Sequence, residues 1–292
     1  MTDVFALRAR IGAEPEKVYR AFTDGAALST WLADHAEVDT AGNRFGFWGE
    51  HVPEGEPGRQ RLLEAEPARL VRFAWLLSGD ETVVEVRLEP DDGTGTLLTL
   101  TQTGLPTWEE LMSGTGKRDL IHTFWSASVA NLVNFVEGRE LVPKCDFADL
   151  ERDAAQTEVR IGAPPEEVYA SLTEPEQLNR WLARDAQVDL KVGGRISFDG
   201  EGEGCEILAL EPAKTLSHTW SFGGRQTVVT WELDGTDGQT RLTLVHSGFG
   251  GGNPGAAAQQ ESGWLAYLAT LKRMHELGPD WRPHAVGMEF AA

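Results

Sequence analysis

The phrase "RIGAPPEEVY" occupies Arg160–Tyr169, and a near copy, "RIGAEPEKVY", occupies Arg10–Tyr19. The likeness continues in the same order: "WLADHAEVD" at 31–39 and "WLARDAQVD" at 181–189, then "LTLTQTG" at 98–104 and "LTLVHSG" at 242–248. Proteins built by stacking repeats have units of about 20 to 50 residues. The copies here lie much farther apart, so the sequence indicates one whole domain that has been duplicated.

The duplication predicts two domains and a linker. We expect the first copy to span 1–138, the linker 139–155, and the second copy, with a C-terminal tail, 156–292. The linker prediction rests on the stretch "RELVPKCDFADLERDAA", which is charged and contains a proline, as connections between domains commonly are.

Composition narrows the class of protein. With 41% hydrophobic and 25% charged residues, the chain has the balance of a soluble globular protein. It has no apolar run long enough for a membrane helix, and its start lacks the pattern of a signal peptide. We therefore expect a cytoplasmic protein, and the Ala, Gly and Arg usage favours a bacterial one. A formal charge of −20 disfavours nucleic acid and anionic membranes as partners.

Each copy has the same predicted order of elements: a short strand, two small helices, five or six strands, and a long helix. The alternation is clear in the second copy, where Leu216, His218 and Trp220 fall on one side of a strand, and Ser217 and Thr219 fall on the other. Such alternation is typical of an antiparallel sheet with one wet face. We expect final helices at about 117–136 and 261–277. The fold class is therefore α+β.

A curved sheet and one apolar-faced helix can bury each other, but the sheet seldom closes fully on a single helix. We expect a gap between them to hold an apolar ligand. The candidate cavity residues occupy inward positions of strands and final helices: Phe73, Trp75, Gln102, Ile121, Trp125 and Ser128 in the first copy, and His218, Trp220, Trp231, His246, Trp264, Tyr267 and Leu268 in the second. Because its inward rings are bulkier, the second copy is expected to be the more filled one.

Two features of the second copy raise the question of catalysis. His218 lies on an inward face, where a general acid or base needs a hydrogen-bonded partner and a nearby substrate. Its counterpart in the first copy is Phe73, and an apolar ring at that position favours a pocket-lining role for His218.

The glycine-rich stretch "FGGGNPG" (249–255) lacks the Lys-Ser or Lys-Thr ending of a phosphate-binding loop and is better interpreted as a pocket lip. We predict no catalytic residues and no cofactor.

Metal binding and disulfides are not expected either. Cys205, His218 and His246 lie on three different predicted strands and lack the close spacing of zinc ligands. The chain has only two cysteines, Cys145 and Cys205, too few for a disulfide framework, and both are expected to be reduced.

Several blocks of the second copy carry a resemblance. "APPEEVYASLTEPEQLNRWLA", "VGGRISFDG", "ALEPAKTLSHTW" and "VVTWELDGTDGQTRLTLVHSGF" resemble, in order, blocks of the heat-shock protein 90 ATPase activator homologue family, of the START-like (SRPBCC) superfamily. The match is close over 157–278 and looser over 3–138, where "AGNRFGFWG" replaces the glycine-pair block and Gln102 stands at the position of His246. The resemblance implies two tandem helix-grip domains, each a curved antiparallel sheet around its C-terminal helix.

Three hypotheses of function follow. The first is a non-catalytic binding protein that holds a small hydrophobic molecule, or a protein partner, in the cavities between sheet and helix. The second is an enzyme like the polyketide aromatase/cyclases, with Arg195, Tyr267 and His218 as the groups of interest. The third, implied by the resemblance, is a chaperone co-factor that stimulates an Hsp90-type ATPase.

Overall fold

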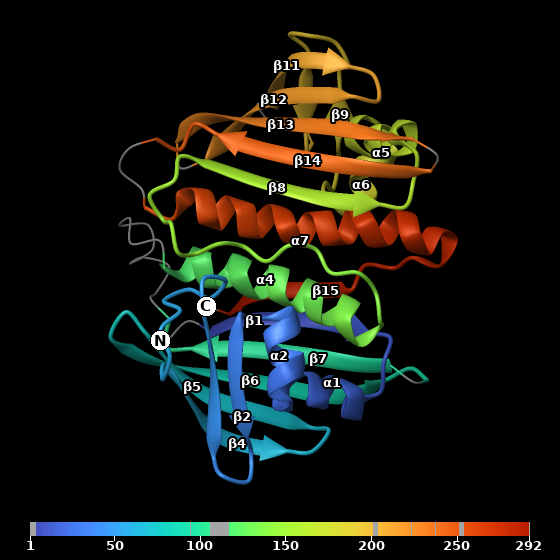
Figure 1. Cartoon of the computed structure of the whole chain (residues 1–292). Coiled ribbons are helices and arrows are strands. Elements are labelled where there is room, and N and C mark those ends of the chain that lie inside the picture. Colours follow the sequence, from blue (N-terminus) through green and yellow to red (C-terminus); the bar gives the residue numbers. More distant parts are fainter. Residues whose placement is uncertain are drawn as a thin grey trace. The chain divides into compact units, whose positions relative to one another are not determined.

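The structure, a computed structural model, describes residues 4–93, 95–105, 117–200, 204–222, 224–236, 238–250 and 254–291. The chain divides into two compact units (Figure 1). The first consists of Met1–Asp149 together with His284–Ala292, and the second of Leu150–Pro283. No helix in the described ranges is long and apolar enough to cross a membrane.

The first unit follows the predicted order. Its elements are β1 (Val4–Ile11), α1 (Pro15–Thr23), α2 (Gly25–Trp31), β2 (His35–Asp39), β3 (Arg44–Trp48), β4 (Gln60–Glu66), β5 (Leu70–Leu77), β6 (Asp80–Asp91), β7 (Gly95–Thr103) and α4 (Lys117–Val136). A last strand, β15 (Ala285–Ala291), comes from the C-terminal end of the chain. The sheet has the order β15-β1-β7-β6-β5-β4, its ladders are antiparallel, and β2 and β3 form a separate hairpin.

The second unit repeats this order of elements, but its counterparts of β2 and β3 belong to the main sheet. Its elements are β8 (Ala154–Ile161), α5 (Pro165–Thr173), α6 (Pro175–Trp181), β9 (Gln187–Val188), β10 (Arg195–Ser197), β11 (Cys205–Glu211), β12 (Thr215–Phe222), β13 (Arg225–Thr236), β14 (Gln239–Ser247), α7 (Ala256–Leu277) and a short 3-10 helix, η1 (Gly278–Asp280). The antiparallel sheet has the order β8-β14-β13-β12-β11-β10-β9. The predicted α+β class, with two small helices after the first strand and a long final helix in each copy, is confirmed.

The repeated opening phrase explains how each unit starts. Pro15 and Pro165 begin α1 and α5, where proline lacks an N–H that the first helical turn does not need. The tryptophans of the repeated "WLA" then fasten the second small helix to the first. Trp31 donates its indole N–H to the carbonyl of Ala21 at 3.0 Å, and Trp181 donates to the carbonyl of Ser171 at 2.9 Å. The same local sequence therefore builds the same corner twice.

Residues 139–149, part of the predicted linker, are bound to the first unit. The side-chain amide of Asn131 pairs with the backbone of Val142 through two hydrogen bonds of 3.0 Å. The Lys144 ammonium donates to the carbonyl of Ser29 at 3.2 Å and also to that of Ala33. The extended segment is therefore held at several points, and β8 begins at Ala154, within the predicted linker range.

The C-terminal residues, left as a tail by the sequence, form β15 in the sheet of the first unit. β15 pairs antiparallel with β1, with Val4 opposite Ala291 and Ala9 opposite Ala285. Residues 284–292 therefore belong to the first unit, although they follow the second unit in the sequence.

Candidate functional site

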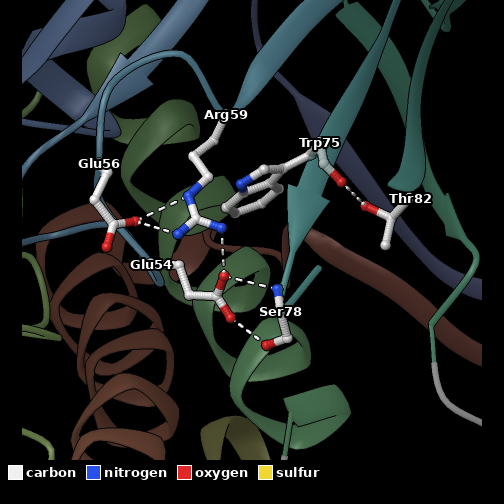
Figure 2. Close-up of polar contacts among 6 residues, drawn as sticks. All are labelled: Glu54, Glu56, Arg59, Trp75, Ser78 and Thr82. Atoms are coloured by element: carbon white, nitrogen blue, oxygen red, sulfur yellow. Dashed lines mark hydrogen bonds and ion pairs between the residues drawn. The ribbon is translucent and has the colours of Figure 1, made fainter. Parts of the chain in front are cut away.

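A chain of hydrogen bonds joins the final helix of the first unit to its sheet. Trp125 on α4 donates its indole N–H to Oε1 of Gln102 on β7 at 2.7 Å. The Gln102 amide donates to Oγ1 of Thr82 on β6 at 2.9 Å, and the Thr82 hydroxyl donates to the carbonyl of Trp75 on β5 at 2.8 Å. Figure 2 shows this last bond. Gln102 and Trp125 are completely buried, so this chain is a fixed part of the interior.

The second unit has the same chain with a histidine in place of glutamine. Trp264 on α7 donates to Nδ1 of His246 at 3.0 Å, and Nε2 of the same ring lies 2.8 Å from Oγ1 of Thr227. The Thr227 hydroxyl donates to the carbonyl of Trp220 at 2.9 Å. An indole N–H can only donate, so Nδ1 of His246 must accept and Nε2 must carry the proton. His246 is therefore neutral and of one tautomer.

Burial opposes protonation of both inward histidines. It lowers the pKa of His246 to about 3, with a further contribution from His218. Burial also lowers the pKa of His218 to about 4, although its hydrogen bond to Thr219 acts in the other direction. Nε2 of His218 accepts from the Trp231 indole at 3.2 Å, so Nδ1 carries the proton and donates to the Thr219 carbonyl at 2.9 Å. Both nitrogens of each ring are thus engaged.

Aromatic rings occupy the interior of the first unit. The Phe73 ring lies 4.7 Å from Phe45, and the Trp75 ring lies 5.2 Å from Phe47 and 6.0 Å from Trp125, measured between centroids. All of these rings are buried, as are the candidate residues Ile121 and Ser128. Among the candidates of the first unit, Trp125 therefore contacts both Trp75 and Gln102, and Phe73 and Trp75 both pack against Phe47.

The loop between β3 and β4 closes the end of this interior (Figure 2). The Arg59 guanidinium donates to Glu54 at 2.9 Å and to Glu56 at 2.9 Å. Glu54 also accepts from the backbone N–H of Ser78 at 2.7 Å and from its hydroxyl. The backbone of Arg59 accepts from the N–H of Leu76, beside Trp75. The completely buried Trp75 indole N–H has no hydrogen-bond partner among the described residues.

At the corresponding end of the second unit, the described aromatic residues are more exposed. Trp220, the counterpart of Trp75, is partly exposed, as is Phe198, and Tyr267 is 40% exposed. The ring of Trp220 lies 5.4 Å from Phe198 and 5.1 Å from Trp264, and Trp264 lies 6.2 Å from Tyr267. Partial burial of Tyr267 and the nearby Asp199 raise the pKa of its hydroxyl. We call Phe198, Trp220 and Tyr267, with Trp264 behind them, the aromatic mouth.

The remaining candidates of the second unit, Trp231 and Leu268, are buried behind this mouth with His218 and His246. Trp220 is more exposed than its counterpart Trp75, while the inner candidates of both copies are buried, so the more filled interior expected for the second copy stays a prediction. Phe198 was missed as a site residue. Its signal was the alignment of "RISFDG" with "RFGFWG", which makes Phe198 the counterpart of Phe47, a ring in contact with Trp75.

The first unit also has a hollow of about 990 Å³ on a different side. Its lining comes from the start of α1 and from the strand ends around Leu70, Leu88 and Leu97, with charged residues such as Glu14 and Arg69. None of the predicted cavity residues lines it.

In the part of the chain that the structure describes, no three His, Cys, Asp or Glu side chains gather as metal ligands. Burial raises the pKa of Cys205 to about 11, so this thiol is neutral at pH 7.

Two units with the same order of elements, each a curved antiparallel sheet against its final long helix, define a tandem helix-grip protein. The family described as Activator of Hsp90 ATPase homolog 1-like protein matches residues 12–137 and again 162–276. The chain belongs to this family, of which it carries two copies, as the resemblance implied.

Two solved structures and one curated relative are examples of proteins that match parts of the chain. A solved structure of a Mesorhizobium loti protein is 30% identical, covers 43% of this chain and 98% of its own, and has a TM-score of 0.39. The Aha1 dimer from Colwellia psychrerythraea is 25% identical, covers 43% of this chain and 98% of its own, and has a TM-score of 0.38. An uncharacterized protein of Schizosaccharomyces pombe is 30% identical over 91 residues, which are 30% of this chain and only 27% of that relative.

Proposed function

We propose that this chain is a non-catalytic binding protein whose second unit holds a small apolar molecule at the aromatic mouth. The observation that carries the proposal is the partial exposure of Trp220, whose ring lies 5.4 Å from Phe198 and 5.1 Å from Trp264. The counterpart of Trp220 in the first unit, Trp75, is completely buried by its neighbours and by the β3–β4 loop. Exposed neighbouring rings leave apolar surface in water, and a flat apolar ligand would cover it.

The wall behind the mouth supports this function because it is held in place. Trp264 is fixed by its hydrogen bond to His246, and His246 is fixed by Thr227. A ligand that stacks on such rings loses little binding free energy to ordering side chains. The preferred ligand is therefore an aromatic or polycyclic molecule.

The polar groups of the interior favour binding over chemistry. A general acid or base needs a free nitrogen or oxygen within reach of the substrate. His218 and His246 are neutral at pH 7, and both nitrogens of each are hydrogen-bonded within the protein. Of the groups named for an aromatase/cyclase-like activity, His218 is buried and Arg195 is exposed.

Isothermal titration calorimetry with small aromatic compounds, such as naphthalene carboxamides and flavones, tests the proposal. We expect saturable binding by the intact chain and at least about tenfold weaker binding by Trp220→Ala, since truncating a central aromatic contact commonly costs more than about 1 kcal/mol. Trp48→Ala is the matched control, because Trp48 is a partly exposed tryptophan in the first unit. Equal affinity in the two variants, or no binding by any compound, would refute the proposal.

A protein partner is the second candidate. The family description names activation of the Hsp90 ATPase, and the second unit exposes three large apolar side chains, Leu190, Val192 and Leu208. Exposed apolar side chains of this size are common in protein interfaces. A binding assay with an Hsp90-type ATPase, followed by ATP turnover, tests this candidate. Val192→Asp should weaken the interaction, and unchanged turnover on adding the intact chain would contradict it.

A further inference from the structure

The aromatic mouth presents ring surface to the solvent. Trp220 lies 5.4 Å from Phe198 and 5.1 Å from Trp264, and Trp264 lies 6.2 Å from Tyr267, measured between ring centroids. The faces of aromatic rings carry partial negative charge, so they attract cations as well as apolar groups. Several neighbouring rings of this kind are a common recognition site for a substituted ammonium group.

Two carboxylates lie beside these rings. Asp199 follows Phe198 directly in the chain, and its backbone is bridged to that of Asp185. Both acidic residues are exposed, and neither carboxylate forms an ion pair with a residue that the structure describes. The alignment of "RISFDG" with "RFGFWG" makes Trp48 the counterpart of Asp199, so the first unit has no charge at this position. The acidic rim is therefore specific to the second unit.

One positive charge lies at the same rim. The backbone N–H of Arg184 donates to the carbonyl of Phe198 at 3.1 Å. Burial is the largest cause of the raised pKa of the Tyr267 hydroxyl, Asp199 raises this pKa further, and Arg184 lowers it by a smaller amount. With Asp185 next to Asp199, the rim charges have a negative sum. The formal charge of −20 on the whole chain acts in the same direction at longer range.

The first unit supplies a cation of its own at the corresponding end. Arg59 lies in the loop that closes this end, and its guanidinium is paired with Glu54 and Glu56 (Figure 2). When "LLEAEPARL" is aligned with "ILALEPAKT", the counterpart of Arg59 is Gly204, which has no side chain. The second unit therefore has carboxylates at this end but no arginine in the position of Arg59.

We propose that the ligand of the aromatic mouth carries a positively charged nitrogen, and that Asp199 and Asp185 select it over neutral and anionic molecules of the same ring system. This inference rests on the proposed function, because it assigns the chemical class of the ligand at the same site. The nitrogen lies against the ring faces of Trp220 and Tyr267, beside the carboxylates, while Arg184 weakens its binding. The ligand is thus an aromatic amine in its ammonium form.

Calorimetry with three naphthalene compounds of matched shape tests the charge preference. At pH 7 a naphthyl methylamine is cationic, a naphthalene carboxamide is neutral and a naphthalene carboxylate is anionic. We expect the amine to bind at least about fivefold more tightly than the amide, and the carboxylate to bind more weakly than the amide. Equal affinities of amine and amide, or tighter binding of the carboxylate, overturn this inference but leave the proposed function standing. No binding by any of the three overturns both.

Single variants separate the rim carboxylate from the charge of the whole chain. Asp199→Asn should reduce the advantage of the amine over the amide to less than about twofold, and Arg184→Gln should increase that advantage. The matched control is Asp234→Asn, which removes another exposed carboxylate of the second unit, one that is paired with Arg241. This control should keep the advantage of the amine. Equal loss in both aspartate variants would assign the preference to net charge and overturn the role of Asp199, and so would an undiminished advantage in Asp199→Asn.

Discussion

Trp264 donates its indole N–H to Nδ1 of His246 at 3.0 Å, the bond that Trp125 makes with Gln102 in the first unit. An amide offers an oxygen acceptor and an N–H donor on opposite sides, and a neutral imidazole protonated at Nε2 offers the same pair. What both units require at this position is therefore an acceptor toward the helix and a donor toward the threonine. Two different residues meet that requirement.

The first prediction concerns replacement of His246. His246→Gln should keep the hydrogen-bond chain and change the free energy of unfolding at pH 7 by less than about 1 kcal/mol. His246→Leu should lower the free energy of unfolding by about 1–3 kcal/mol, because it leaves the N–H of buried Trp264 unpaired. Urea denaturation followed by circular dichroism measures both. Equal losses in the two variants would show that ring packing, and not the hydrogen bonds, decides the stability.

The second prediction is an acid sensitivity of the second unit. The pKa of His246 is lowered from 6.5 to about 3, so between these values the unfolded chain binds more protons than the folded one. Stability conferred by the neutral ring is complete above pH 6.5 and is lost as the pH falls toward 3, with a slope of up to about 1.4 kcal/mol per pH unit. His218, lowered to about 4, acts in the same direction.

Unfolding free energies at pH 7.0, 5.5 and 4.5 check this dependence. His246→Gln should lose less stability than the natural chain over this range, because glutamine does not titrate. His275, whose pKa burial also lowers, is present in both proteins and cancels in the comparison. Parallel pH profiles would contradict a buried neutral His246.

The sequence predicted the fold and the inward strand residues because the duplication shows each position twice. Phe73 beside Trp75 and His218 beside Trp220 were recognised by alternation and are buried or partly buried as expected. The pairing of Gln102 with Trp125 was not predictable, since it depends on how α4 lies against β7. Strand β15 was missed because its partner, β1, lies at the other end of the chain, and local pattern carries no signal for such a pairing.

The third prediction concerns Lys144, which holds the extended segment after α4 to the first unit. Burial lowers the pKa of this ammonium, and nearby Asp34 opposes the shift. Lys144→Met should remove the hydrogen bonds to the carbonyls of Ser29 and Ala33 and cost about 1.5–3 kcal/mol of stability. Faster hydrogen exchange at 139–149 should accompany the loss. Lys191→Met is the control, because Lys191 is an exposed lysine whose ion pair is with Asp189.

The fourth prediction concerns the loop that closes the first unit over Trp75. Glu54 has a positive φ of 51° and joins Arg59 to Ser78, which lies in the two-residue turn between β5 and β6. Glu54→Ala should release both partners and speed hydrogen exchange across 49–59, with a cost in stability below about 1 kcal/mol, because the Arg59 pair is partly exposed. Glu56→Ala, which removes only the more exposed partner of Arg59, should change exchange much less.

Since Trp75 is the counterpart of the exposed Trp220, loosening this loop should also let the first unit bind the aromatic ligands of the second. Calorimetry on Glu54→Ala in a Trp220→Ala background would then detect a binding site that Trp220→Ala alone lacks, and no binding there would mean that the packed rings, not the loop, close the first unit.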